Sequence, residues 1–181
     1  MTDTELARRI ADGDADAMGE MIRLYHAGLY RFLRQLTRSR EDAEDLAQQT
    51  LIRARDGAGR FDARASMKTW LHSIAFHEFT RWRRRQRWHL GLAQAPPIED
   101  RRFEAVLEAE WLEEALGSLP DGMRAVFLLH EIEQMPLAEV AAVLGVPVGT
   151  VKSRLFNARE KLRARLGDRR EVLHATEAYE S

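Results

Sequence analysis

Apolar residues recur at helical spacing over most of this chain, and the alternation typical of strands is nearly absent. In the segment 21–36, one face collects the apolar side chains Ile22, Tyr25, Leu29, Phe32 or Leu33, and Leu36. A helix with such a stripe must bury it against other elements. The pattern therefore predicts an all-α fold.

Capping residues and glycines mark where the first helices begin and end. Ser39 is a predicted N-cap, because Asp42 follows three residues later in a capping-box-like pattern. The segment 57–66 is rich in glycine and polar residues and predicts a break, after which Ser66 can cap the next helix. That helix is expected to carry Met67, Trp70, Leu71, Ile74, Phe79 and Trp82.

A segment without helical periodicity divides the chain into two helical domains. It contains the paired prolines Pro96 and Pro97 and predicts a flexible linker. We expect a first domain over 1–90, a linker over 91–103, a second domain over 104–167 and a flexible tail over 168–181. In the second domain, Pro120 and Pro136 each predict a helix start.

The stretch LAEVAAVLGVPVGTVKSRL (137–155) meets the requirements of a helix-turn-helix. Ala141 is small where two helices would cross, and Gly145 suits a left-handed turn. Five apolar side chains can fill the wedge between the helices: Val140, Leu144, Val146, Val151 and Leu155. The polar face of the second helix would then enter a DNA major groove.

The residue types on that face suit base and phosphate contacts. Asn157 can pair with adenine through two hydrogen bonds, while Thr150 and Ser153 can bond bases or phosphates. Lys152, Arg154 and Arg159 can neutralise phosphates, and Phe156 adds an apolar surface.

Charge is distributed unevenly, although the 28 basic and 29 acidic residues nearly cancel. The segment 79–98 contains no acid, yet holds five closely spaced arginines: Arg81, Arg83, Arg84, Arg85 and Arg87. Aromatic residues lie among these cations, a combination that suits unstacked bases and their phosphates. This region is therefore a second candidate for nucleic-acid binding.

The chain has no cysteine, which excludes disulfides, thiolate metal sites and a cysteine nucleophile. The polar N-terminus lacks the apolar core of a signal peptide, and no apolar run is long enough to cross a membrane. We expect a cytoplasmic protein that is not embedded in a membrane.

Two stretches resemble a known family. SLPDGMRAVFLLHEIEQMPLAEVAAVLGVPVGTVKSRLFNAREKLRARL resembles region 4 of the extracytoplasmic-function (ECF) sigma factors of bacterial RNA polymerase. REDAEDLAQQTLIRA, followed by GRFDARASMKTWLHSIAFHEFTRWRRRQR, resembles region 2 of the same family. The resemblance implies a dissociable subunit that joins core RNA polymerase and directs transcription from particular promoters.

The resemblance also implies roles for individual residues. Region 2 would bind the clamp helices of the largest polymerase subunit through Asp45, Gln48 and Gln49. It would read and open the −10 element through Trp70 and the preceding loop, whose candidate contacts are Phe61, Arg64, Ser66 and Lys68. Phe61 could instead fill the core of the domain. The aromatic and basic residue types of the helix itself add Phe76, His77, Arg81, Arg84 and Arg85 as candidates. Phe76 and His77 fall off the apolar stripe and are expected to face outward, whereas Trp70 and Trp82 also fit a core role.

Region 4 would bind the flap of the second-largest subunit and read the −35 element through Lys152, Ser153, Phe156 and Asn157. An anti-sigma factor is an expected partner. No cofactor, metal, small-molecule substrate or enzymatic activity is implied. Asn157, His77 and Arg81 differ from residues frequent in the family, so the promoter sequence stays open.

Three other functions fit parts of the sequence. A metal enzyme would need ligands that share a helical face, but His72 and His77 are five positions apart. A helix-turn-helix activator that does not join the polymerase would share the second domain, but it would need a sensor or phosphoacceptor domain. An adaptor built of helical hairpins would not need the base-reading face.

Overall fold

The computed structural model describes residues 1–89 and 113–179, with side chains described for 1–86 and 113–165. The predicted linker, 91–103, lies outside the described residues. Within them every regular element is helical, which confirms the all-α class. The elements are α1 Asp3–Ala11, α2 Ala15–Thr37, α3 Arg40–Gly57, the 3₁₀ turn η1 Ala58–Arg60, α4 Met67–His89, α6 Asp121–Phe127, the π-helical turn η2 Leu128–Ile132, α7 Leu137–Leu144 and α8 Val148–Tyr179.

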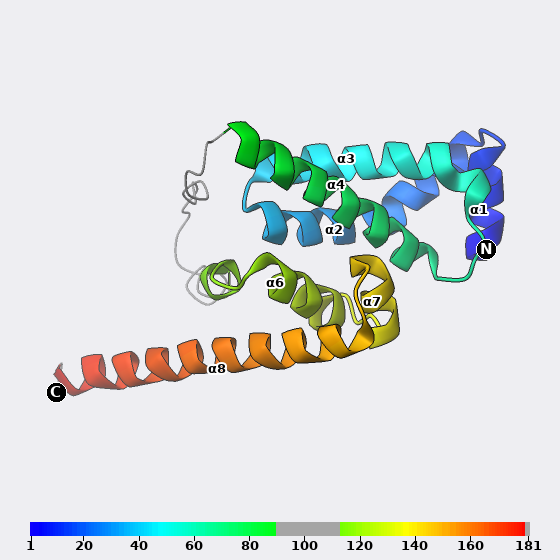
Figure 1. The fold of residues 1–181 in the computed structure, drawn as a ribbon. Helices are drawn as coiled ribbons and strands as arrows, with labels where there is room; N and C mark the ends of the chain where they lie inside the picture. The colour runs from blue at the N-terminus through cyan, green and yellow to red at the C-terminus, as the bar shows by residue number, and fades with distance from the viewer. Residues whose placement is uncertain (90–112, 180–181) are drawn as a thin grey trace.

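The first domain packs α2, α3 and α4 side by side, with α1 across one end (Figure 1). Its core contains most of the predicted stripe of α2, but Ile22 is 40% exposed and Met21 is buried in its place. The apolar stripe of α2 is wider than its buried part, and the neighbouring helices cover the edge that carries Ala17 and Met21 rather than the edge that carries Ile22.

Side-chain caps fix the helix starts where the sequence predicts them. The Ser39 hydroxyl accepts a hydrogen bond from the Asp42 amide at 3.2 Å, and the Ser66 hydroxyl accepts one from the Thr69 amide at 3.1 Å. Helix α1 was not predicted, because its apolar face is short. A carboxylate oxygen of Asp3 in α1 accepts the Met67 amide at 2.6 Å, so α1 also ties down the start of α4.

The second domain contains the predicted helix-turn-helix. Gly145 adopts the left-handed conformation, with φ of 64°, between α7 and α8. Val140, Val151 and Leu155 are buried between these helices, as expected, while Leu144 and Val146 are half-buried.

Two further details of this domain differ from expectation. The helix that begins at Asp121 ends in the π turn η2, where the Glu133 amide donates to the Leu128 carbonyl five residues earlier at 2.9 Å. The last helix was expected to give way to a tail after Gly167, but α8 continues to Tyr179. Residues that favour helices follow Gly167, and they outweigh one interior glycine.

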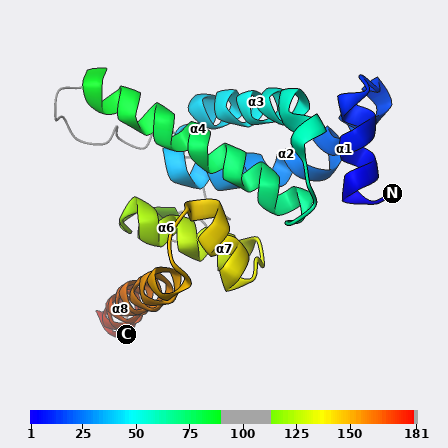
Figure 2. The same ribbon diagram turned by 45° about the vertical axis from the view of Figure 1, so that its right-hand side comes forward.

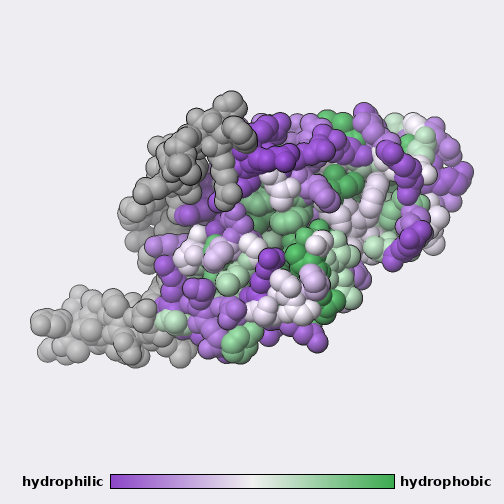
Figure 3. All heavy atoms as spheres, in the orientation of Figure 1, coloured by the Kyte–Doolittle hydropathy of each residue, from purple (hydrophilic) through white to green (hydrophobic). Residues whose placement is uncertain are grey.

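The two domains pack against each other. α7 lies against α4, and α6 lies against α2, while α8 runs along the side away from the first domain (Figures 1 and 2). Figure 3 shows hydrophilic residues over much of this face and paler, more hydrophobic residues near α7. One predicted contact residue, Lys68 of α4, lies within this interface between domains.

Candidate polymerase and nucleic-acid interfaces

The polar face of α3 points away from the core. Asp45 and Gln48 are exposed and Gln49 is half-buried, while Leu46 and Thr50 face inward. The Gln48 amide donates to Glu44 at 3.2 Å. Asp45 forms no ion pair with any residue that the structure describes. The three predicted contact residues thus form one solvent-facing patch with an available carboxylate.

The loop before α4 contains predicted DNA contacts that differ in exposure. Some of them are packed or bonded within the protein, and others face solvent. The Phe61 ring is half-buried and packs on Trp70, with ring centroids 5.3 Å apart and planes at 57°. The Arg64 side chain is 88% exposed and pairs with Asp62 at 2.7 Å. The Ser66 hydroxyl is used in the cap of α4. Of these residues, Arg64 is the one most available to a ligand.

The aromatic residues of α4 lie closer to the core than predicted. Phe76 was expected to face outward, but its ring is half-buried beside Phe79, with centroids 6.2 Å apart. The reason is that the stripe of α4 broadens beyond the one predicted. Trp82 stacks on Phe79 and donates its indole N–H to Asp42 at 2.9 Å. His77 is exposed, as expected.

The arginines at the end of α4 are mostly open to solvent. Arg84 and Arg85 are exposed, and the Arg81 side chain is 55% exposed. Arg81 lies 3.7 Å from the buried carboxylate of Glu78, which pairs with Arg53 of α3 at 2.6 Å. These cations form a basic surface held by the packing of α3 and α4.

Lys68 was predicted to contact DNA, but its side chain, 38% exposed, is paired with the second domain. Its ammonium group lies 2.9 Å from a carboxylate oxygen of Glu133 and donates to the Glu133 carbonyl at 2.5 Å. The sequence gives no sign of this pair, because the two residues lie 65 positions apart in different domains. In the packed arrangement, Lys68 serves the domain interface.

The outer face of α8 is open. Lys152, Ser153, Asn157 and Arg159 are exposed, and Phe156 is 64% exposed. Thr150 and Arg154 are half-buried at its flank. The Arg154 guanidinium packs over Gly122, where an added Cβ would lie only 3.1 Å from Arg154 Nη1.

Two contacts restrain this face without covering it. The Ser153 hydroxyl donates to the Thr150 carbonyl at 3.0 Å, and Arg159 Nε donates to Glu131 at 2.9 Å. Both can be exchanged for contacts with a ligand, because the residues stay in solvent. The structure therefore brings the predicted −35 residues together on one accessible surface.

Sequence reasoning missed a buried polar cluster around Glu133. The Glu133 side chain is 6% exposed and receives Lys68, together with Arg31 of α2 at 3.5 Å. His72 Nε2 lies 3.9 Å from the same carboxylate and has no hydrogen-bond partner among the described residues. Burial lowers the pKa of His72 below its usual value, although Glu133 opposes that shift.

Arg124 is a second residue that joins the domains, and it too was missed. Its buried guanidinium donates to the carbonyls of Leu116, Gly117 and Leu119 at 2.8 Å, and to those of Gln35 and Leu36 at 3.3 and 3.4 Å. The last two are in the final turn of α2, where carbonyls lack helical partners. One side chain therefore satisfies helix ends from both domains.

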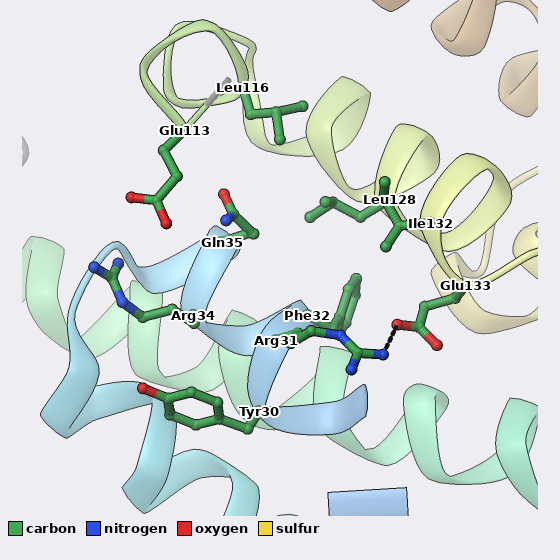
Figure 4. Close-up of a pocket in the computed structure, with 10 residues that line it drawn as sticks. All are labelled: Tyr30, Arg31, Phe32, Arg34, Gln35, Glu113, Leu116, Leu128, Ile132 and Glu133. Carbon is green, nitrogen blue, oxygen red and sulfur yellow. Dashed lines mark ion pairs between the residues drawn. The ribbon is translucent and has the colours of Figure 1, made fainter. Parts of the chain in front are cut away.

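A groove of about 300 Å³ lies beside these contacts, between α2 and the helix formed by α6 and η2 (Figure 4). Phe32, Leu116, Leu128 and Ile132 give it an apolar lining. Arg31 and Glu133 form an ion pair at its edge. The groove exists because the two domains are packed together.

Two other kinds of site are absent from the described part of the chain. No group of three or more His, Cys, Asp or Glu residues there could hold a metal ion. None of the helices described is long and apolar enough to span a membrane.

Comparisons with known proteins agree with the two-domain architecture. Sigma-70 region 2 matches residues 21–89, and Sigma-70, region 4 matches residues 109–162. The chain is 34% identical to the ECF RNA polymerase sigma factor SigM of Mycobacterium tuberculosis, covering 92% of this chain and 85% of that one. It is 29% identical to the ECF RNA polymerase sigma factor SigW of Bacillus subtilis, covering 89% and 95%.

Two solved structures are also similar. CnrH, in complex with the cytosolic domain of CnrY, has a TM-score of 0.72 and 29% identity, covering 92% of this chain and 97% of CnrH. The sigma factor RpoE of Bartonella quintana, in complex with the anti-sigma factor NepR, has a TM-score of 0.73 and 26% identity, covering 82% and 96%. Matching regions in the same order, over nearly the whole chain, show that this protein belongs to the ECF sigma factors of bacterial RNA polymerase.

Proposed function

We propose that this ECF sigma factor uses three separate surfaces to direct transcription initiation. The face of α3 that carries Asp45, Gln48 and Gln49 binds the clamp helices of the largest polymerase subunit, and the second domain also binds the flap of the second-largest subunit. The loop before α4, with α4 itself, reads and opens the −10 element. The outer face of α8 reads the −35 element.

The observation that carries this proposal is the open polar face of α8 at the second helix of a helix-turn-helix. Phe156 is 64% exposed beside Ser153 and Asn157, an arrangement with no value for internal packing. A helix docked in a major groove would cover it. Base edges can accept or donate to an amide such as Asn157, and phosphates can pair with Lys152 and Arg159.

The −10 assignment is supported by the pairing of exposed cations with a nearby aromatic cluster. Extracting a base from a duplex costs a few kcal/mol, and stacking on an aromatic side chain offsets about 1–3 kcal/mol per base. Arg81, Arg84 and Arg85 lie on the same helix and can hold neighbouring phosphates. Arg64 extends the basic surface into the preceding loop.

The polymerase assignment is tested by transcription with purified core enzyme and mapping of the transcript starts. The double variant Asp45→Arg with Gln48→Ala should fold normally and bind core polymerase less tightly by about 2 kcal/mol, roughly 30-fold, as expected for a hot spot. Asp12→Arg, which makes the same acid-to-arginine change at the end of α1, is the control. Unchanged core binding by the folded double variant would place the interface elsewhere.

An anti-sigma factor is the proposed regulator. Two similar solved structures are complexes of this kind, CnrH with CnrY and RpoE with NepR. Such a partner would inactivate the protein by covering the clamp-binding face of α3 and the flap-binding face of the second domain. In a purified complex, added hydrogen-exchange protection should appear over 45–49 and in the second domain; its absence from both would exclude this mode of inhibition.

The cell compartment and the chemistry follow from the same role. A subunit that joins RNA polymerase on chromosomal DNA works in the cytoplasm. Its contribution is binding and promoter opening, while RNA synthesis belongs to the polymerase, so the chain is not itself an enzyme.

A further inference from the structure

We propose that Glu78 is a positioning residue for promoter reading: it fixes the guanidinium of Arg81, so that this side chain reads a guanine of the −10 element. The inference rests on the proposed role of α4 and deepens it. It separates Arg81, as the reader of a base, from Arg84 and Arg85, which hold phosphates.

Glu78 of α4 faces α3, which runs beside α4 (Figure 1). The Glu78 side chain is 6% exposed, and one of its carboxylate oxygens, Oε1, meets two arginines. This oxygen lies 2.6 Å from Nε of Arg53 in α3 and 3.7 Å from Nη1 of Arg81 in α4. A single buried carboxylate therefore stands beneath two guanidinium groups from neighbouring helices.

Stability alone gives a weak reason for a carboxylate at this position. The attraction within a buried ion pair is largely offset by the loss of hydration of the charges, and apolar residues of similar size often stabilise a fold as well or better. The neighbouring Phe79 and Ala75 show that α4 otherwise fills its buried face with apolar side chains. The charge of Glu78 is therefore best explained by the arginines that it orients.

The two arginines stand in different relations to this carboxylate. Arg53 makes the short contact and anchors the carboxylate to α3. Arg81 makes the longer contact, and its side chain remains 55% exposed. The closest approach involves Nη1, so the other N–H groups of the planar guanidinium fork are available to a ligand. Arg81 is thus oriented from below and open above.

The other arginines of the same surface lack such a restraint. His77, Arg81 and Arg85 follow one another at intervals of four residues, so they share one exposed face of α4. Arg84 and Arg85 form no ion pair within the part of the chain that the structure describes. A guanidinium without a fixed direction can still neutralise a phosphate, which carries no sequence information.

Reading a base makes a stricter demand on geometry. A functional side chain must be held close to its productive orientation by packing and by supporting polar contacts. Arginine has only donors, and guanine presents two acceptors, O6 and N7, that match its fork. Adenine and cytosine present an amino group there and would meet Arg81 donor to donor. An oriented Arg81 should therefore select guanine.

The test measures base preference in the complete holoenzyme. Core polymerase with the full chain is mixed with a short single-stranded DNA library of randomised sequence, and the bound molecules are sequenced. Core polymerase alone gives the background. The variant is Glu78→Gln, and its control is Glu5→Gln. The control changes the net charge equally and also breaks a glutamate–arginine pair spaced by three residues, with Arg8 in α1.

The wild type and the control should favour guanine about tenfold at one position, as for a bidentate contact. In Glu78→Gln this preference should largely vanish, while total binding to the library stays equal or rises because a negative charge beside the DNA is lost. Preserved guanine preference would overturn the proposal. An equal fall in binding to all sequences would also overturn it, since that result indicates general damage to α4.

A double-mutant comparison shows whether Glu78 acts through Arg81. In the Arg81→Ala background, Glu78→Gln should cause no further loss of preference, because the oriented group is already missing. In the Arg84→Ala background, Glu78→Gln should cause its full loss. Equal effects in both backgrounds would mean that Glu78 does not work through Arg81.

A surface substitution covers the case in which Glu78→Gln does not fold. Arg81→Lys keeps the charge but replaces the planar fork with a single ammonium group. It should lose the guanine preference and retain most of the total binding. Retained preference in Arg81→Lys would contradict a base contact by an oriented guanidinium.

Failure of this proposal can be told from failure of the proposed function. The same holoenzymes are assayed for promoter-directed transcription. If the wild type directs transcription but shows no guanine preference that depends on Glu78, this inference fails and the sigma function stands. If the wild type neither directs transcription nor selects any base, the proposed function itself fails.

Discussion

The proposed −35 and −10 surfaces use the same kinds of side chain but differ in what surrounds them. On α8, Asn157, Phe156 and Lys152 face solvent, and none of them has a partner from the first domain among the described contacts. On α4, Lys68 and Arg83 are paired with acidic residues of the second domain. Availability for DNA thus depends on domain packing as well as on residue type.

The ion pairs at the two surfaces also differ in their expected energies. Arg159 and Glu131 form a pair whose side chains are 45% and 31% exposed, where water and salt screen the attraction. At the domain interface, Glu133 and Arg124 are each buried among their own partners. Removing either side chain would leave its buried partners without a hydrogen bond and without water. Substitutions at the domain interface should consequently have the larger effects on stability.

The largest effect is expected for Arg124→Met. This change keeps much of the side-chain volume but leaves carbonyls from both domains without their donor. We predict a loss of about 3 kcal/mol or more in the free energy of unfolding, measured by urea denaturation. The comparison variant is Arg159→Met, which should lose no more than about 1 kcal/mol. Equal losses in the two variants would show that side-chain contacts at the domain interface stabilise the fold no more than those on the open surface.

A smaller effect is expected for Phe61→Ala. This variant should lose about 2 kcal/mol in the free energy of unfolding, because the half-buried Phe61 ring packs on Trp70.

Arg64→Ala should leave stability unchanged but reduce transcription from duplex promoters. A promoter whose −10 region is supplied as a mismatch bubble should restore much of the lost transcription. Thermal melting and transcription on both templates separate these roles. Equal, unrescued loss for a stable Arg64→Ala protein would exclude its role in opening DNA.

On the open surface, Asn157→Arg should change the preferred base at one −35 position, since arginine suits guanine and asparagine suits adenine. The preferred base should be favoured over the others by about 1–3 kcal/mol.

Arg159→Ala should instead weaken binding to all sequences and reduce the salt dependence of binding, as for a phosphate contact. Binding to a library of −35 sequences would reveal both. A uniform loss for Asn157→Arg would mean that Asn157 only positions the backbone.

The smallest predicted effect concerns pH and the buried His72. Burial lowers the pKa of His72 in the folded protein, so below its usual pKa of about 6.5 the unfolded chain holds more protons at this position. The contribution to stability is complete above that pH and declines as the pH falls towards the lowered value. One such group changes the free energy of unfolding by at most about 1.4 kcal/mol per pH unit.

The test for His72 compares urea denaturation of the wild type and His72→Gln through this pH window. Lys68, Arg31 and Glu133 face the imidazole and remain in both proteins. The variant should show a flatter dependence of stability on pH. An unchanged slope would assign the pH dependence to other groups.

Local structure could be predicted from the sequence because its causes lie within a few residues. Ser39, Ser66 and Gly145 each act on the adjacent turn, and all three have the predicted roles. The helix-turn-helix also follows from short-range spacing. The polar faces of α3 and α8 could be placed for the same reason, since helical periodicity determines which residues share a face.

The domain interface could not be predicted, because it joins residues distant in the chain. Lys68 meets Glu133 across 65 positions, and Arg124 meets Gln35 across 89. A cation at a helix start, such as Lys68, can pair with a DNA phosphate or with a buried carboxylate, and the local sequence does not distinguish the two. Ile22 shows the same limit on a smaller scale, because the helices packed against α2 determine which edge of its apolar stripe is buried.

The π-helical turn at Leu128–Ile132 has a consequence for mutation by insertion and deletion. A turn of this type holds one more residue than the α-helical turn that could replace it, so an in-frame loss of one codon there is a conservative event for the helix. Because the wider turn accommodates that residue, its loss would leave Glu133 aimed towards Lys68. The same loss from the α-helical residues before the turn would instead rotate every later residue by about 100° and aim Glu133 elsewhere. A chain one residue shorter at the π turn would therefore keep the packing between its two domains, whereas a chain shortened just before it would not.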